Sequence, residues 1–145
     1  MSKEVMLVTG AGQISMAIAR RMGYGRKIIL GDKNENNAQV VAEIMNQAGF
    51  DVEPFVMDMS SRNSIQAMVQ KATEYGEVKA LVCGAGVSPS QAPIEVILQV
   101  DLYGTAVLME EVGKVIAKGG AGVISPVSPV IACRHSRRSR TGRWR

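Results

Sequence analysis

Short apolar runs recur along the chain, separated by longer stretches in which apolar residues return every three or four positions. Five runs predict β-strands, at residues 4–9, 27–30, 52–57, 80–83 and 122–124. The stretches between them predict helices over 13–22, over 35–48, from a cap at Ser60 or Ser61 to a stop at Gly76, and over 93–117. Helices that alternate with short strands imply parallel pairing and a doubly wound α/β sheet.

A glycine turn follows the first predicted strand at once. Its pattern is G-x-G-x-x-S, formed by Gly10, Gly12 and Ser15. In a dinucleotide-binding turn the first glycine permits the tight turn, the second lets the backbone approach a pyrophosphate, and the N–H groups of the next helix face the anion. The pattern favours a Rossmann-like, NAD(P)-binding sheet. An ordinary tight turn between a strand and a helix is the alternative.

Asp32 stands 20 residues after Gly12, at the end of the second predicted strand. A carboxylate at this place can accept both hydroxyl groups of an adenosine ribose and repels a 2′-phosphate, which favours NAD over NADP. The neighbouring Lys33 could accommodate such a phosphate, so NADP stays open as a cofactor. The alternative role for Asp32 is that of a turn residue before the second helix.

The charge of the chain is divided unevenly. Residues 1–124 carry 11 Lys and Arg against 13 Asp and Glu, a net charge of −2, whereas residues 125–145 carry six Arg and no acid, a net charge of +6. We therefore expect a dinucleotide-binding domain at 1–125, without a nucleic-acid-binding face, and a basic, disordered tail at 126–145. The tail is either an arm that binds a polyanion or the product of out-of-frame translation, because a two-base skip after Ser125 can restore the letters I-S-S-Q-S-G.

Other residue types narrow the function further. Hydrophobic residues make up 46% of the chain, enough for the core of one domain, and no apolar run is long enough to cross a membrane. Cys83 follows Leu81 and Val82 and is most simply interpreted as a small buried residue. Cys83 and Cys133 lie far apart and the chain has a single histidine, so we expect neither a metal site nor a disulfide framework. This cysteine usage suggests a reducing compartment, and the cytoplasm is the expected location.

Five features in order resemble the short-chain dehydrogenase/reductase family, over residues 3 to about 125. They are T-G-A-G-Q-I-S at 9–15, Asp32, Asp58, C-G-A-G at 83–86 and V-D-L-Y-G at 100–104. The resemblance implies an NAD- or NADP-dependent oxidoreductase that transfers a hydride between the nicotinamide and a small alcohol or carbonyl substrate. It also implies a set of cofactor-binding residues, which are Gly10, Gly12, Gln13, Ile14, Asp32, Lys33, Asp58, Met59, Cys83, Gly84, Ala85 and Gly86.

The resemblance gives these residues separate roles. Gly10, Gly12 and Ile14 would line the pyrophosphate and the nicotinamide. Asp58 and Met59 would flank the adenine, and the C-G-A-G segment would pack over the adenosine ribose.

The family's catalytic residues have no intact counterpart in this sequence. Asp101 stands at the position of a helix asparagine, and Pro126 follows Ser125 where the family carries a second serine. The tail contains no tyrosine and no lysine. Tyr75 and Lys79 fit the pattern Y-x-x-x-K, but they precede the fourth strand, so we interpret the match as a coincidence. We expect a catalytically incomplete N-terminal part of an oxidoreductase, truncated or shifted in frame after about residue 125.

A chain of this kind would leave its sheet incomplete on the C-terminal side. An exposed apolar strand edge invites pairing with a second copy, which makes a homo-oligomer possible. The alternative function is a non-catalytic nucleotide-binding module whose basic arm contacts a polyanion.

Overall fold

A computed structural model describes residues 3–125 of the protein. Five parallel strands form one sheet in the order β3-β2-β1-β4-β5. The strands are β1 (Lys3–Thr9), β2 (Lys27–Asp32), β3 (Asp51–Val56), β4 (Gly76–Cys83) and β5 (Ile116–Ile124). The chain builds outward from β1 to β3 and then crosses back to β4, so the predicted doubly wound, Rossmann-like sheet is confirmed.

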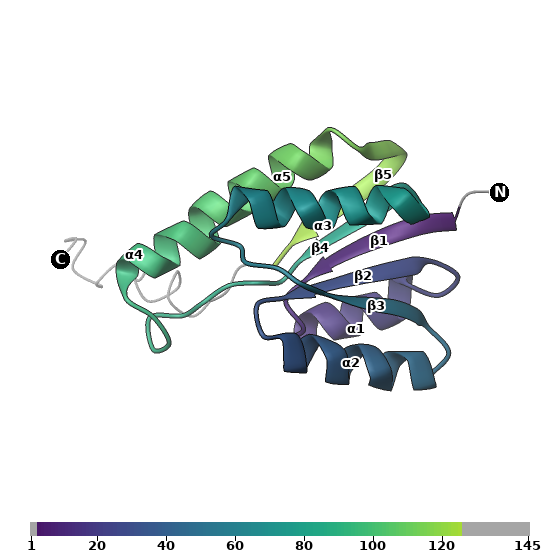
Figure 1. Cartoon of the computed structure of the whole chain (residues 1–145), viewed down its shortest axis with the longest axis horizontal. Coiled ribbons are helices and arrows are strands. Elements are labelled where there is room, and N and C mark those ends of the chain that lie inside the picture. Colours follow the sequence, from purple (N-terminus) through teal and green to yellow (C-terminus); the bar gives the residue numbers. More distant parts are fainter. Residues whose placement is uncertain (1–2, 126–145) are drawn as a thin grey trace, which may run out of the picture.

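Helices cover both faces of this sheet, α1 and α2 on one side and α3 and α5 on the other (Figure 1). The helical elements are α1 (Gln13–Met22), α2 (Glu35–Gln47), α3 (Arg62–Tyr75), α4 (Ile94–Ile97), the π-helix η1 (Leu98–Gly104) and α5 (Thr105–Gly113). Side-chain caps at the start of α2 and α3 come from Asn34 and Ser61. These caps fix where each helix begins relative to the strand before it.

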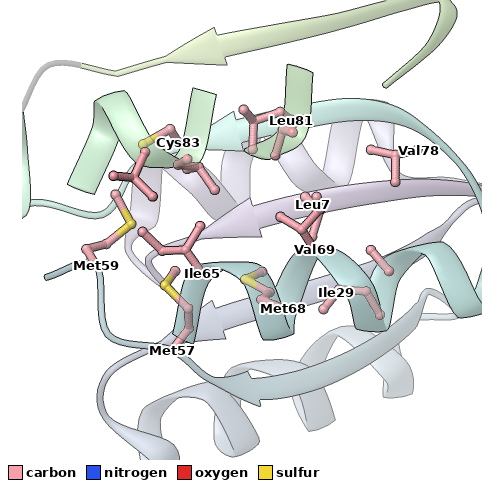
Figure 2. Packing of buried hydrophobic residues seen from close by; sticks show 14 of the residues in the cluster. Leu7, Ile29, Met57, Met59, Ile65, Met68, Val69, Val78, Leu81 and Cys83 are labelled. Carbon is pink, nitrogen blue, oxygen red and sulfur yellow. The ribbon is translucent and has the colours of Figure 1, made fainter. Parts of the chain in front are cut away.

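Alternate residues of β1 serve the two layers of the core. Met6 packs beneath α1 and α2, whereas Leu7 packs beneath α3 and α5, and neither has exposed surface. In the second layer Ile29 joins Leu7 from the sheet, and Met68 and Val69 come from α3 (Figure 2). Full burial of one such side chain contributes about 1.5–3 kcal/mol. Strand β1 is therefore the centre of both layers.

The predicted start of a helical segment at residue 93 is confirmed, but its predicted end at residue 117 and the predicted start of the fifth strand at residue 122 are wrong. The helical segment ends at Gly113, and β5 begins at Ile116. Residues 117–120 bulge out of the ladder between β5 and β4. The glycines that resemble the stop of a long helix therefore belong to a bulge within a strand.

Strands β3 and β5 form the edges of the described sheet. At the end of β5, Val123 and Ile124 are 43% and 40% exposed. Beside them Leu81, Met109 and Ile116 help to line an open apolar hollow of about 240 Å³. The C-terminal side of the sheet thus carries apolar surface that no described residue covers.

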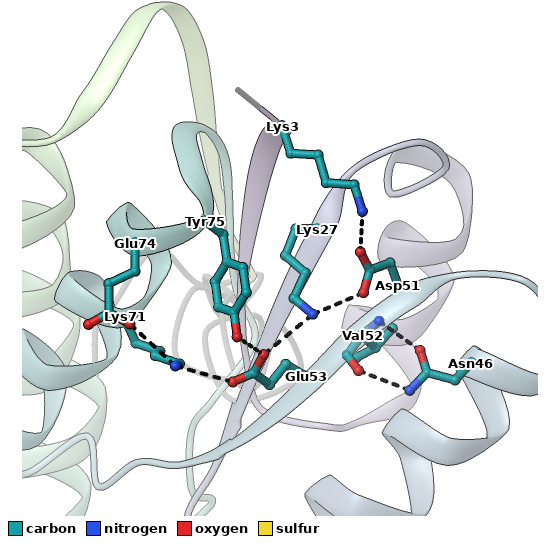
Figure 3. Close-up of polar contacts among 9 residues, drawn as sticks. All are labelled: Lys3, Lys27, Asn46, Asp51, Val52, Glu53, Lys71, Glu74 and Tyr75. Carbon is teal, nitrogen blue, oxygen red and sulfur yellow. Dashed lines mark hydrogen bonds and ion pairs between the residues drawn. The ribbon is translucent and has the colours of Figure 1, made fainter. Parts of the chain in front are cut away.

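Charged side chains join α3 to β2 and β3 near the amino-terminal ends of the strands, which we call the amino edge of the sheet (Figure 3). Lys27 Nζ donates to Asp51 Oδ1 at 2.9 Å and lies 3.4 Å from Glu53 Oε2, to which the Tyr75 hydroxyl also donates. Burial alone would raise the pKa of the Glu53 carboxyl. The hydrogen bond from Tyr75 and the ammonium groups of Lys27 and Lys71 outweigh burial and hold this pKa below its ordinary value of 4.5.

We expect Glu53→Gln to lower the free energy of unfolding at pH 7 by about 1 kcal/mol, because the variant loses the ion pairs of this carboxylate. The pKa of Glu53 is lowered in the folded state, so its contribution is present above pH 4.5 and is lost as the pH falls through the folded-state value. The difference between wild type and variant should be smaller at pH 3 than at pH 7. Urea denaturation at both pH values measures it, and equal differences would contradict the prediction.

Candidate functional site

A pocket of about 360 Å³ opens at the carboxyl ends of β1, β2 and β4. Loops from four parts of the sequence meet there. The lining residues are Gly10, Ala11, Gly12, Gly31, Asp32, Lys33, Asn37, Met57, Asp58, Met59, Gly84, Ala85, Gly86, Val87, Val96 and Val100. The position agrees with the rule that ligands of doubly wound sheets bind at the carboxyl ends of the strands, where the strand order reverses.

The glycine turn between β1 and α1 lies in close contact with the loop after β4. Gly10 has a φ of +81°, and its N–H donates to the carbonyl of Gly31 at 2.7 Å. A Cβ atom at Gly10 would lie only 2.7 Å from the backbone nitrogen of Ala85. Only glycine satisfies both demands, because the conformation is left-handed and the space is already filled by backbone.

Helix α1 begins beside the pocket, which its N-cap residue lines. Its N-cap residue is Gly12, and no side chain caps the helix there. The first N–H groups of a helix have no partner within the helix, and together with the helix dipole they favour an anion. The arrangement suits a phosphate or pyrophosphate group.

Asp32 is held in one orientation by three donors. Its Oδ2 accepts the backbone N–H of Ala11 at 2.9 Å and the side-chain amide of Asn37 at 3.1 Å. Its Oδ1 accepts the N–H of Asn34 at 2.8 Å. Asp32 thus ties the glycine turn to the start of α2, as its interpretation as a turn residue predicts, and it also lines the pocket.

A second carboxylate, Asp58, also lines the pocket and follows β3, the strand next to β2. Its Oδ1 accepts the hydroxyl and the N–H of Ser60 at 2.7 and 2.9 Å, while Lys33 Nζ lies 3.4 Å from Oδ2. The Ser60 hydroxyl, chiefly, and the charge of Lys33 hold the pKa of Asp58 below its ordinary value. Asp58 therefore stays ionised at neutral pH, with Oδ2 directed toward an ammonium group.

The π-helix η1 packs against the wall of the pocket. A Cβ atom at Gly104 would lie 2.2 Å from the carbonyl oxygen of Met59, so the helix and the loop after β3 touch through their backbones. Asp101 Oδ1 accepts the N–H of Val87 at 3.0 Å and fixes the loop after β4. π-Helical segments occur frequently at functional sites. The contacts of η1 with this pocket are made with loops that are distant from it in the sequence.

Nine of the expected residues line the pocket, and three do not. Gln13 and Ile14 lie in the first turn of α1, where Ile14 is 63% exposed. Cys83 is 1% exposed and belongs to the hydrophobic core. As the last residue of β4, it directs its side chain into the core layer, and the chain reaches the pocket only at Gly84. The expected contact of Cys83 with a ribose is corrected accordingly.

Sequence reasoning missed several residues of the pocket wall. Asn37, Val87 and Val96 line the pocket, as does Val100, although Val100 belongs to a segment that carries the resemblance. The signal for Asn37 was its place in the first turn of α2, one turn beyond Asp32. No periodicity in the sequence indicates the contacts of Val87 or Val96, because the path of the chain after β4 places Val87 and the short helix α4 beside the pocket.

Tyr75 and Lys79 lie far from this pocket along the sheet. Tyr75 ends α3 at the amino edge, and Lys79 Nζ donates to the carbonyl of Lys118 at 3.0 Å. The expectations for the tail at 126–145, as a basic arm or a frame-shifted segment, lie outside the described residues.

Comparison with known proteins decides the family. The family model described as short chain dehydrogenase matches residues 4–138. The chain belongs to this family. A short-chain dehydrogenase/reductase of Alternaria brassicicola is 38% identical over 124 residues, which cover 86% of this chain and 45% of the relative. The chain thus spans about half the length of the relatives that it matches.

Solved structures of the family share the fold. A short chain dehydrogenase from Mycobacterium smegmatis superposes with a TM-score of 0.74 at 23% identity, covering 85% of this chain and 57% of that one. Actinorhodin polyketide ketoreductase, solved with NADPH, has a TM-score of 0.68 at 29% identity, covering 77% of this chain and 47% of the reductase.

Residues 3–125 contain neither of two other kinds of site. Within that range no helix is both long and apolar enough to span a membrane. The same residues contain no group of three or more His, Cys, Asp or Glu side chains that could hold a metal ion.

We expect Asp101→Ala to lower the free energy of unfolding by about 1 kcal/mol, because the N–H of Val87 loses its acceptor. Asp101→Asn keeps an acceptor oxygen at the same place and should stay within about 0.5 kcal/mol of wild type. Chemical denaturation of both variants measures the difference. Equal losses would show that the negative charge, rather than the hydrogen bond, is what the loop requires.

Proposed function

We propose that this chain binds NAD or NADP in the pocket, as the cofactor-binding part of a short-chain dehydrogenase-type oxidoreductase. One observation carries the proposal. The pocket combines a glycine turn, a helix N-terminus without a side-chain cap and two carboxylates, Asp32 and Asp58, at the ends of the neighbouring strands β2 and β3. The close approach of Gly10 to Ala85 leaves a backbone-lined cradle that side chains would fill, and such a cradle fits a pyrophosphate.

The proposed assignments follow the order of groups along a dinucleotide. Gly12 and the first turn of α1 would hold the pyrophosphate, with Gln13 and Ile14 on the nicotinamide side. Asp32 would accept the ribose hydroxyls and Asp58 the adenine amino group. Lys33 and Met59, with the segment 84–86, would complete the walls, as these residues line the same pocket.

Hydride transfer with a small alcohol or carbonyl substrate is the proposed activity of the enzyme type. A bound nicotinamide supplies the hydride donor or acceptor. Among residues 3–125 no tyrosine lines the pocket, so we assign cofactor binding, and not proton transfer, to the described part of the chain.

Two supporting proposals concern the state of the protein in the cell. The free, buried thiol of Cys83 is consistent with a reducing compartment, for which we propose the cytoplasm. The exposed apolar residues at the edge strand β5 support self-association of the chain.

Asp32→Ala should weaken NADH binding by about tenfold, because the ribose hydroxyls lose a charged acceptor. The matched control is Asp51→Ala, which removes a carboxylate at the opposite, amino edge of the sheet and should leave the affinity unchanged. Titration of NADH fluorescence measures both. If the wild-type protein binds no NADH or NADPH, the proposed function is wrong.

Lys33→Met tests the choice between the two cofactors. The variant removes the cation that could meet a 2′-phosphate, so NADPH affinity should fall by about tenfold. NADH affinity should change by less than about twofold, because NAD carries no such phosphate. Parallel titrations with NADH and NADPH give the ratio, and an unchanged ratio would mean that Lys33 stays on Asp58 when either cofactor binds.

A further inference from the structure

Ser15 stands where a dinucleotide-binding turn ordinarily has its third glycine. That glycine allows the helix to pack closely on the strand beneath it. Here Ser15 lies in the first turn of α1 and is only 2% exposed. A serine is larger than the glycine that the motif has at this position, so a neighbouring residue must leave room for its buried side chain.

The space lies at Gly84, the first residue after β4. A Cβ atom on Gly84 would lie 1.9 Å from Ser15 Oγ and 3.3 Å from Ser15 Cβ. The hydroxyl could rotate away from the first contact, but the contact between the two Cβ atoms would remain. The two residues are 69 positions apart in the sequence. The side chain of Ser15 occupies the space that a side chain at Gly84 would need.

Gly84 has no freedom to move away from Ser15. Its N–H donates to the carbonyl of Thr9 at 2.9 Å, which fixes it to the end of β1. On another side its carbonyl carbon lies within 2.9 Å of the place where a Cβ atom of Gly10 would stand. Any atom added at Gly84 would therefore displace α1 rather than the loop after β4.

We infer that Ser15 and Gly84 form one packing pair, in which Gly84 supplies the space of the missing third glycine and sets the position of the start of α1. The inference rests on the proposed function, because the first-turn N–H groups of α1 are the proposed pyrophosphate ligands. Ser15 and Gly84 are positioning residues. The Cβ direction of Gly84 points to Ser15, so the pair acts on the cofactor through the helix.

A double-mutant cycle on the full chain tests the pair, with Gly84→Ala, Ser15→Gly and the combination of both. The readouts are the Tm and the affinities for ADP-ribose, which carries a pyrophosphate, and for adenosine, which does not. The control is Gly113→Ala at the end of α5, where an added Cβ meets no atom within 4 Å. The control should leave the Tm and both affinities close to wild type.

Gly84→Ala should lower the Tm and weaken ADP-ribose binding by about tenfold, while adenosine binding changes by less than about threefold. Adding Ser15→Gly should restore most of both losses. Independent, additive effects would overturn the pair, and so would an equal loss of affinity for the two ligands. If the Gly84→Ala variant is insoluble, a double variant that is soluble and folded supports the pair. A double variant that is also insoluble overturns it.

The cycle separates this inference from the proposed function. A wild-type protein that binds neither NADH nor ADP-ribose overturns the proposed function and the positioning role. The coupling in Tm still decides whether the packing pair exists, because it needs no ligand.

Discussion

The contact between the glycine turn and the loop after β4 is the constraint on which the site depends. Gly10 brings its backbone against Ala85, and Gly84 lies against Ser15 and is bonded to Thr9. These contacts join β1, β4 and α1 within a few ångströms of one another. The pocket exists because no side chain fills this junction, and backbone N–H groups are left to face whatever binds there.

The amino and carboxyl ends of the strands carry different kinds of polar contact. At the amino edge, cations and anions pair with one another, as Lys27 does with Asp51 and Glu53 (Figure 3). At the carboxyl ends of the strands, backbone N–H groups, the Asn37 amide and the Ser60 hydroxyl orient Asp32 and Asp58, and Lys33 is the one ammonium group beside them among the contacts described above. Donors of this kind fix a carboxylate without neutralising it. The amino edge thus stabilises the fold, and the carboxyl edge keeps negative charge available for a ligand.

The sequence predicts what is local and misses what depends on contacts between distant segments. Asp32 and Asp58 could be placed because each follows a strand, and the ends of parallel strands meet at one edge. For Cys83 the apolar residues before it indicate burial, whereas the family resemblance implies a ribose contact, and a shift of one residue decides between the core and the pocket. Thr9, fully buried with no partner for its hydroxyl among the described residues, likewise gives no signal in the sequence.

The same limit applies to the helical segment after the fourth strand. Its apolar spacing predicts one long helix. The structure instead has a π-helix, η1, where Gly104 contacts Met59, and the later glycines form a bulge in β5. The contact between Ser15 and Gly84 likewise could not be predicted from the sequence. Ser15 departs from the glycine pattern, but only the fold shows that Gly84 lies against it.

The central position of β1 has a consequence for how the protein folds. Thr9 pairs with Gly31 on one side, 22 residues away, and with Cys83 on the other, 74 residues away. Pairings that close longer loops cost more chain entropy and form more slowly. During synthesis β1, β2 and β3 can pair while the other edge of β1 stays open until residue 83 has emerged. The junction that creates the pocket is therefore among the last parts of the sheet to assemble, and the half-built sheet is the stage most exposed to misassociation.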